Sequence, residues 1–271
     1  MNFAGKAIII TGSNSGIGKA TALLFARQGA SVLIHGRDLE TLEQTVKECK
    51  QIGAENAKFP MVQGDVQDTG TLKKIFKAAV EEFGKIDILV NNAGCPQMAS
   101  FSDGSEESFD WQLNVNLKAP IFLSQMCFPE LKKAGGNIVN ISSACGACPN
   151  AIGMSFYAVA KAGLNQFTQC AAIEFGSEGV RVNAVCSGMV KTPAYKKLFG
   201  LKSDEEVDAF LDRATKSTPT PTKYVTAEET AKLIVYLASD DASMMNGACI
   251  IHDGGSSLIG NDLKTIEKYN N

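Results

Sequence analysis

Residues 6–18, KAIIITGSNSGIG, place an isoleucine-rich run directly before a turn that contains three glycines. The run predicts a buried strand, and the apolar spacing after the turn predicts a helix that ends before Gly29. This order brings backbone N–H groups and a helix N-terminus against a phosphate. The spacing of Gly12, Gly16 and Gly18 departs from G-x-G-x-x-G, so a tight turn without a ligand is the alternative.

The second expected strand, 31–36, ends beside two residues that bear on the identity of a dinucleotide. At this point of a dinucleotide-binding fold, a carboxylate accepts the ribose 2′-hydroxyl of NAD, whereas an arginine accommodates the 2′-phosphate of NADP. Asp38 has a suitable separation from Gly18, but Arg37 is closer to the strand. Because a guanidinium binds a phosphate that a carboxylate repels, we expect NADP(H), with Asp38 as a helix N-cap. NAD(H) is the alternative.

Apolar runs and helix-like segments alternate along the rest of the chain. We expect strands at 6–11, 31–36, 58–63, 86–90, 137–143, 181–186 and 248–252, and later helices at about 39–51, 72–83, 106–132, 157–175 and 227–237. The very apolar run 86–90 is typical of a strand inside a parallel sheet covered on both faces. The alternation predicts an α/β fold with a single doubly wound, seven-stranded parallel sheet and helices on both faces.

We assign residues 1–260 to one dinucleotide-binding domain and residues 261–271 to a polar C-terminal tail that should fray. The segment 187–224 interrupts the alternation and contains one helix-like piece at 203–215. Long loops in compact domains often bind or cover ligands, and ligands of open α/β sheets bind at the carboxyl ends of the strands. We therefore expect 187–224 to shape a substrate site.

Composition excludes several classes of protein. The 271 residues are 45% hydrophobic and 20% charged, with a net charge of −3, as in ordinary globular chains. No long basic run or basic and aromatic patch suggests a nucleic-acid partner. The N-terminal apolar run is too short for a signal peptide, and no run is long enough for a membrane span. We expect a cytoplasmic protein.

The eight cysteines are spread along the chain, mostly in apolar surroundings, as reduced thiols would be. Cys145 and Cys148 form a C-x-x-C pair, which can be a redox pair or half of a zinc site. Zinc would need two further ligands, and His35 and His252 stand alone. We expect no metal.

Tyr157 and Lys161 are four residues apart in an expected helix, just after Ser142 and Ser143 at the end of an expected strand. Helical residues at this spacing are neighbours on one face. A positive charge near a phenol favours the phenolate and would move the Tyr157 pKa toward neutrality. The spacing alone is common in helices, so a structural pair is the alternative.

Taken together and in order, five pieces resemble the short-chain dehydrogenase/reductase family. They are TGSNSGIG at 11–18, NNAG at 91–94, Asn116 in NVNL, Ser143 in NISSA, and Tyr157-x-x-x-Lys161. The similarity covers nearly the whole chain and includes RVNAVCSG and NGACIIHDGG near its end. The resemblance implies a Rossmann-like fold and a homotetramer that uses the helices holding Asn116 and Tyr157.

The resemblance also implies a catalytic role for each matching side chain. Tyr157 would be the general acid or base at a carbonyl oxygen, and Lys161 would lower its pKa and bind the nicotinamide ribose. Ser143, preferred by family position over Ser142, would hold the substrate oxygen. Asn116, preferred in the same way over Asn114, would anchor a water in a proton relay to Lys161.

The resemblance also implies which residues bind the cofactor. The expected cofactor-binding residues, besides Tyr157 and Lys161, are Gly12, Ser15, Gly16, Ile17 and Gly18 at the pyrophosphate, Arg37 at the 2′-phosphate, Asp65 and Val66 at adenine, Asn92, Ala93 and Gly94 beside adenosine, and Val190 and Thr192 at the carboxamide. One departure is Ser187-Gly188, where the family commonly has Pro-Gly, which could make this turn less rigid.

The residues expected around a substrate are largely apolar: Cys95, Cys145, Cys148, Ile152, Met154, Met189 and Tyr195. We therefore predict an NADP(H)-dependent oxidoreductase that moves hydride between nicotinamide and a neutral, fairly hydrophobic ketone or secondary alcohol. One alternative is an NAD-dependent alcohol or hydroxysteroid dehydrogenase. Another is a non-catalytic cofactor-binding sensor or scaffold.

Overall fold

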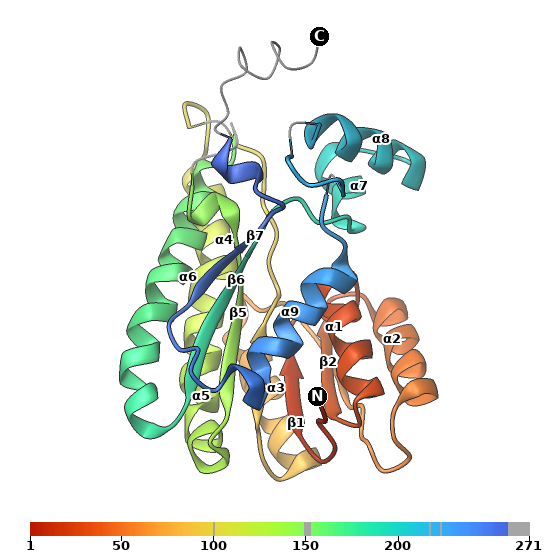
Figure 1. Ribbon diagram of the computed structural model, residues 1–271, viewed down its shortest axis with the longest axis vertical. Helices are drawn as coiled ribbons and strands as arrows, with labels where there is room; N and C mark the ends of the chain where they lie inside the picture. Colours follow the sequence, from red (N-terminus) through yellow and green to blue (C-terminus); the bar gives the residue numbers. More distant parts are fainter. Residues whose placement is uncertain (100, 149–152, 217, 223, 260–271) are drawn as a thin grey trace.

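Seven parallel strands form one sheet in the order β3-β2-β1-β4-β5-β6-β7 (Figure 1), which confirms the predicted doubly wound fold. The computed structural model describes residues 1–99, 101–148, 153–216, 218–222 and 224–259. The strands are β1 (Ala7–Ile10), β2 (Ser31–Gly36), β3 (Met61–Gln63), β4 (Ile88–Asn91), β5 (Asn137–Ser143), β6 (Arg181–Ser187) and β7 (Cys249–His252). The chain order reverses between β1 and β4, where open sheets of this kind have a binding crevice.

Helices cover both faces of this sheet (Figure 1). They are α1 (Gly16–Arg27), α2 (Leu39–Ile52), α3 (Thr69–Phe83), α4 (Glu106–Leu113), α5 (Ala119–Ala134), α6 (Ser155–Glu174), α7 (Ala194–Phe199), α8 (Asp204–Ala214) and α9 (Ala227–Ala238). Successive strand residues point to opposite faces. Ile8 and Ile10 accordingly join the cluster under α1, α2 and α9, whereas Ile9 joins the cluster under α3, α5 and α6.

A buried polar network joins the centre of the sheet to α5 and α6. The Asn91 amide of β4 donates to Asn140 Oδ1 of β5 at 2.8 Å and to Ser124 Oγ of α5 at 3.0 Å. The Asn140 amide donates to Thr168 Oγ1 of α6 at 2.9 Å. All four side chains are buried. Because a buried polar group without a partner costs about 1–3 kcal/mol, these bonds fix both helices against the sheet.

The helix expected at 106–132 is wrong as a single α-helix. A π-helical turn, η1 (Asn114–Lys118), separates α4 from α5. Pro120 stands in the first turn of α5 and has no N–H to donate to the carbonyl of Asn116, four residues earlier. Without that bond, the backbone forms the wider π-helical turn at this point. This is a frequent feature of functional sites.

The third strand begins at Met61, later than the expected residue 58. Pro60 precedes it and cannot donate to a ladder, although its carbonyl accepts from Ile34 of β2 at 2.9 Å. The strands expected at 31–36 and 137–143 match β2 and β5. The remaining strands and helices differ from expectation by a few residues at their ends.

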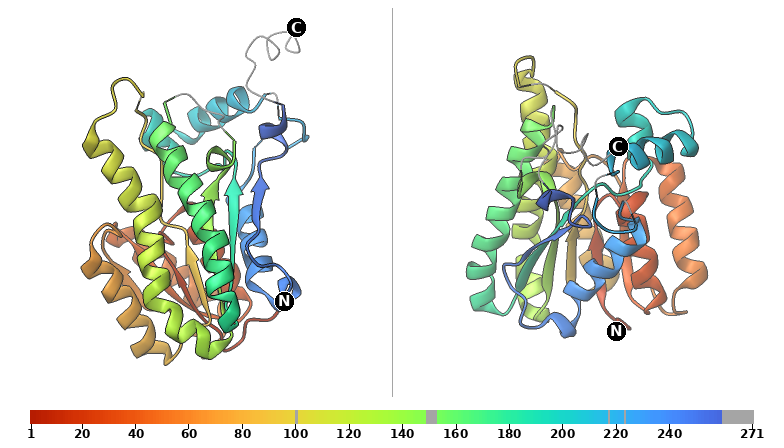
Figure 2. Two further views of the ribbon diagram at one scale, coloured as in Figure 1. Left: turned by 90° about the vertical axis from the view of Figure 1, so that its left-hand side faces the viewer. Right: turned by 45° about the horizontal axis from the view of Figure 1, so that its top comes forward.

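The segment after β6 carries two helices, α7 and α8, over the end of the sheet opposite the N-terminus (Figures 1 and 2). A backbone bridge between Val190 and Val225 closes its base. Lys191 pairs with Asp208 of α8, and the ring centroids of Phe199 and Phe210 are 4.3 Å apart. The predicted loop thus has a packed structure at the carboxyl edge of the sheet.

Within the described ranges, every helix is too short or too polar to cross a membrane. The homotetramer and the cytoplasmic location stay predictions. The C-terminal tail 261–271 lies outside the described residues, as does Ile152 of the expected substrate wall.

Candidate active site

The glycine turn after β1 approaches the end of β4 so closely that side chains are excluded. Gly12 has a φ of 63°, and a Cβ there would lie 2.9 Å from the Ala93 Cα. A Cβ on Gly18 would overlap the Gly12 carbonyl and the Asn92 amide. That amide donates to the carbonyls of Thr11 at 2.8 Å and Gly12 at 3.0 Å. Asn92 therefore holds the turn in the shape of a narrow backbone cradle.

The N-terminus of α1 opens into this cradle. Ser15 is its N-cap but makes no capping bond through its side chain, and the first turn has no acidic residue. Thr192 lies over Gly16, because a Cβ on that glycine would come within 3.1 Å of the threonine methyl group. Ile17 packs on Val190 at the base of the α7–α8 segment. Exposed helix N–H groups and backbone that a ligand can approach fit a pyrophosphate.

At the end of β2, Arg37 and Asp38 take different roles. Asp38 is the N-cap of α2 and accepts from the Thr41 N–H at 2.9 Å, which confirms the predicted cap. The half-exposed Arg37 reaches Asp65 instead, with 3.6 Å between Nη1 and Oδ2. Val66 is buried next to Asp65. The basic group is thus available at the expected adenosine end, and the Asp38 carboxylate is engaged elsewhere.

Ser143, Tyr157 and Lys161 come together where β5 meets α6. Tyr157 is hydrogen-bonded to Ser143, and the Lys161 ammonium lies 5.6 Å from the centre of the Tyr157 ring. Lys161 Nζ also donates to the Ile141 carbonyl at 2.8 Å. Ser142 turns to the other side and donates to the Lys161 carbonyl at 3.2 Å. This orientation supports Ser143 over Ser142 as the serine of the site.

Burial sets the protonation of the pair. It raises the pKa of the Tyr157 phenol, and the nearby Cys145 acts in the same direction, against the hydrogen bond from Ser143. Burial also lowers the pKa of Lys161 to about 8. The net shift of the Tyr157 pKa is therefore upward, opposite to the predicted direction, because burial is its largest cause. The phenol stays protonated at neutral pH and is able to donate a proton.

Asn116 lies in η1 with its side chain buried. Its amide donates to the Gln112 carbonyl at 3.1 Å, to Gln112 Oε1 at 2.9 Å and to the Cys95 carbonyl at 3.2 Å. Its Oδ1 has no hydrogen-bond partner among the described residues. A Cβ on Gly94 would lie 2.6 Å from that oxygen and 3.2 Å from Lys161 Nζ. An unsatisfied acceptor beside an ammonium fits a bound water or hydroxyl group.

The expected substrate residues are only partly brought together. Cys95, Cys145 and Tyr195 are close enough to Tyr157 to affect its pKa. For the other described members the structure gives contacts elsewhere: Met154 pairs with Ala99, the Met189 carbonyl accepts from Val225, and Cys148 is half-buried in the turn after Ala144. Tyr195 comes from α7 and is half-buried. Two thiols and a phenol are thus the members of the expected set that act on Tyr157.

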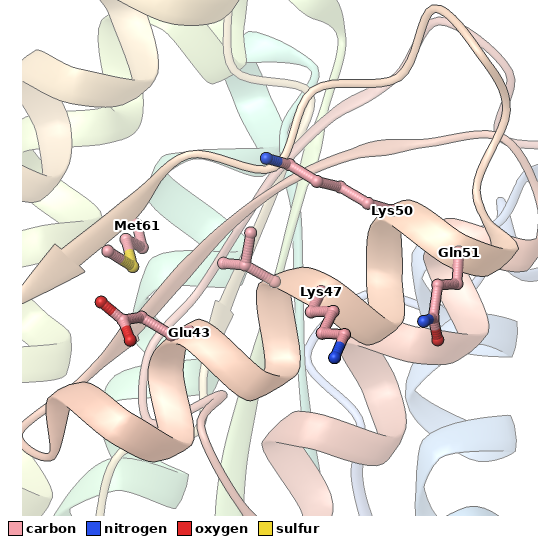
Figure 3. A pocket seen from close by; sticks show the side chains of 6 residues that line it. Glu43, Lys47, Lys50, Gln51 and Met61 are labelled. Carbon is pink, nitrogen blue, oxygen red and sulfur yellow. The ribbon is translucent and has the colours of Figure 1, made fainter.

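Other parts of the described chain give less reason to expect a ligand. In the described part of the chain, no group of three or more His, Cys, Asp or Glu side chains is arranged to hold a metal. A surface hollow against α2 and β3, at the outer edge of the sheet, is lined by Glu43, Val46, Lys47, Lys50, Gln51 and Met61 (Figure 3). Its labelled side chains are exposed, and β3 is four strands away from β5 in the sheet order.

Sequence reasoning missed three residues that shape the site. Gln112 holds Asn116 through its side chain. Ser13 is fully buried and donates to the Ile10 carbonyl at 2.8 Å. His35, which has no metal-ligand spacing, accepts from the Gly12 N–H at 3.1 Å through Nδ1. The polar character of Ser13 within a glycine turn was a usable signal. The contacts of Gln112 and His35 depend on segments distant in sequence.

Known proteins resemble the chain in both sequence and structure. A family model described as enoyl-(acyl carrier protein) reductase matches residues 12–257. An uncharacterized oxidoreductase of Thermotoga maritima is 38% identical over 263 residues, covering 96% of this chain and 100% of that protein. A short-chain dehydrogenase/reductase of unknown function from Caenorhabditis elegans, solved with cofactor, is 35% identical with a TM-score of 0.88; the match covers 96% of this chain and 98% of that one.

A further solved relative is L-sorbose reductase of Gluconobacter frateurii in complex with NADPH and L-sorbose. It is 28% identical, with a TM-score of 0.86, and the match covers 94% of this chain and 97% of that chain. The sheet order, the glycine turn and these matches define a nicotinamide-dependent oxidoreductase. The chain belongs to the short-chain dehydrogenase/reductase family, so the predicted resemblance is confirmed.

Replacing Gly94 with alanine tests the space between Asn116 and Lys161. The added Cβ would displace Asn116 Oδ1 or Lys161 Nζ, and a shift of about 1 Å in such a site can cost about a hundredfold in rate. We expect Gly94→Ala to lower kcat by about that factor in steady-state assays with a ketone and NADPH. Gly70→Ala, in the first turn of α3, is the control; equal rates for both variants would contradict this geometry.

Proposed function

We propose that this chain is an NADP(H)-preferring reductase of neutral, fairly hydrophobic ketones, with Tyr157 as the proton donor. One observation carries the proposal: Ser143, Tyr157, Lys161 and the unsatisfied Asn116 Oδ1 meet at one end of the sheet. The glycine turn and the open N-terminus of α1 lie at the same end. Ligands of open α/β sheets bind there.

The chemistry follows from what each side chain can do. A bound nicotinamide supplies or accepts hydride at the substrate carbon. Ser143 is placed to donate a hydrogen bond to a carbonyl oxygen, and Tyr157 to give that oxygen its proton. Burial raises the pKa of the phenol, so the phenol is protonated before the proton transfer. Lys161 is mostly charged at neutral pH, since its pKa is about 8, and its ammonium can stabilise the phenolate that remains.

Asn116 completes the path for the proton. Its buried Oδ1 faces the Gly94 region beside Lys161. A water held there can pass a proton toward Lys161 after each turnover. The amide itself is fixed by Gln112 and by the Cys95 carbonyl. Its role is to hold this water, and it does not contact the substrate.

Removing the phenolic hydroxyl tests the assignment of the acid. Tyr157→Phe keeps the ring beside Lys161 but cannot donate a proton, so kcat should fall about a hundredfold or more. NADPH binding, followed by fluorescence titration, should change little. Tyr236→Phe, in α9, is the matched control. Full activity of Tyr157→Phe would overturn the mechanism.

The preference for NADP(H) rests on the side chains after β2. Asp38 caps α2, while Arg37 is 58% exposed and only loosely paired with Asp65. A surface pair of this kind is worth little and exchanges readily for a phosphate. The L-sorbose reductase relative was solved with NADPH, which supports the same choice here.

Arg37→Ala should therefore discriminate between the two cofactors. Loss of one charge-assisted contact to a 2′-phosphate should weaken NADPH binding about tenfold or more, with little change for NADH. Lys47→Ala in α2 is the control for a lost surface charge. The measurement is a parallel titration of both cofactors. A wild-type affinity for NADH equal to or above that for NADPH would refute the preference.

The proposed substrate class rests on the side chains that lie near Tyr157. Cys95, Cys145 and Tyr195 lie close enough to Tyr157 to raise its pKa, and Tyr195 packs with Phe199 and Phe210 in the α7–α8 segment. Thiols and aromatic rings favour apolar ligands. Lys191 and Lys196, which could attract an anion, are paired with Asp208 and Asp204.

A panel of ketones tests this substrate class. We expect kcat/KM for apolar diketones, quinones or steroid ketones to exceed that for anionic keto acids of similar size by about tenfold or more. NADPH consumption is the readout. Efficient turnover of an anionic keto acid would contradict the proposed class, and no turnover of any carbonyl would favour a sensor or scaffold.

A further inference from the structure

His35 joins the end of β2 to the glycine turn by three hydrogen bonds. Its Nδ1 accepts from the Gly12 N–H at 3.1 Å, and its carbonyl accepts from the Ser13 N–H at 2.7 Å. Its own N–H donates to Ser13 Oγ at 2.9 Å. The side chain is only 2% exposed. An imidazole is thus built into the core directly beneath the turn.

The peptide groups of Gly12 are consequently held from two sides. The N–H is bound by His35, and the carbonyl accepts from Asn92 of the β4 end at 3.0 Å. Gly12 has a φ of 63°, a conformation that an L-residue rarely adopts. The direction in which the following N–H groups point toward a ligand depends on this orientation. Of these two contacts, the one to the N–H comes from a side chain of β2, that of His35.

The bond to Gly12 requires one particular form of the ring. Because Gly12 donates, Nδ1 must carry a lone pair, and the proton of the neutral ring is on Nε2. A doubly protonated ring would bring two N–H donors face to face and would release Gly12. We propose that neutral His35 is a positioning residue for the dinucleotide: it orients the phosphate-binding turn through Gly12 and so sets cofactor affinity.

The surroundings of the ring keep it neutral under ordinary conditions. Burial lowers the pKa of His35 to about 4, and the charge of Arg37 acts in the same direction. The backbone of Gly64 and the charge of Asp65 act in the opposite direction. Arg37 and Asp65 are the charged groups of the described chain whose fields reach the ring. Protonation therefore begins only in mild acid, below the range in which a solvent-exposed histidine titrates.

This inference rests on the proposed use of the turn for a dinucleotide, and it predicts where the loss of His35 is felt. NADP⁺ contacts both the turn, through its pyrophosphate, and the Arg37 region. Adenosine 2′-monophosphate carries the group for Arg37 but has no pyrophosphate. A positioning role affects the first ligand and spares the second, whereas general destabilisation of the fold would affect both.

Two substitutions distinguish the loss of the hydrogen-bond acceptor from the loss of side-chain volume. In His35→Asn, Oδ1 occupies the place of Nδ1 and can accept from Gly12. In His35→Leu, a branched side chain fills the space without an acceptor. Titration calorimetry with NADP⁺ and with adenosine 2′-monophosphate gives the affinities, and thermal unfolding shows that each variant is folded. If His35→Leu does not fold, wild type and His35→Asn still decide the question by their pH profiles.

We expect His35→Leu to bind NADP⁺ about tenfold more weakly, the usual effect of losing one buried hydrogen-bond partner, and adenosine 2′-monophosphate as wild type does. His35→Asn should recover most of the NADP⁺ affinity. Between about pH 6 and about pH 4, wild-type affinity for NADP⁺ should fall about twofold more than that of His35→Asn, since about half of the imidazole rings gain a proton at pH 4.

Wild-type NADP⁺ affinity in His35→Leu, an equal loss for both ligands, or identical pH profiles for wild type and His35→Asn would each overturn the inference while leaving the proposed function intact. Failure of the wild type to bind either NADP⁺ or NAD⁺ is a different outcome, because it would overturn the proposed function itself.

Discussion

The amide pair Asn91–Asn140 in the middle of the sheet is the interaction on which the arrangement of the site depends. The Asn91 amide of β4 donates to Asn140 Oδ1 of β5 at 2.8 Å. The two amides make further hydrogen bonds to Ser124 in α5 and to Thr168 in α6. Asn116 immediately precedes α5, and Tyr157 is part of α6. Buried amides tolerate few alternative arrangements, because each unmet bond is costly. The proposed catalytic side chains therefore owe their relative positions to a polar core.

The burial of Tyr157 and Lys161 also affects the charge of both side chains. A carbonyl reduction needs a protonated phenol at its start, and desolvation of Tyr157 favours that form. Oxidation of an alcohol would begin from the phenolate, which desolvation opposes. Lys161 responds in the complementary way, since its charged form is also disfavoured by burial. Desolvation thus favours the uncharged form of both side chains.

Much of this arrangement is readable from sequence because it is local. Apolar runs at 31–36 and 137–143 predict two strands with their observed bounds, and the spacing of Tyr157 and Lys161 predicts a shared helix face. The π-helical turn at Asn116 was missed, since it depends on how the backbone adapts around Pro120. The upward direction of the Tyr157 pKa shift was not predicted, because it depends mainly on burial, which is a tertiary property. The link from His35 to Gly12 exists only because β2 lies next to β1.

The bridge between Val190 and Val225 has a consequence for how this fold can diversify. It closes the excursion that carries α7 and α8 at a point where Val190 and Val225 are already buried against α1. The entropy of closing a flexible loop grows only with the logarithm of its length, at about 0.6 kcal/mol for each doubling. Residues between the two valines can therefore be inserted, deleted or exchanged at small thermodynamic cost. The α7–α8 segment is, in this sense, separable from the part of the molecule that stabilises the fold.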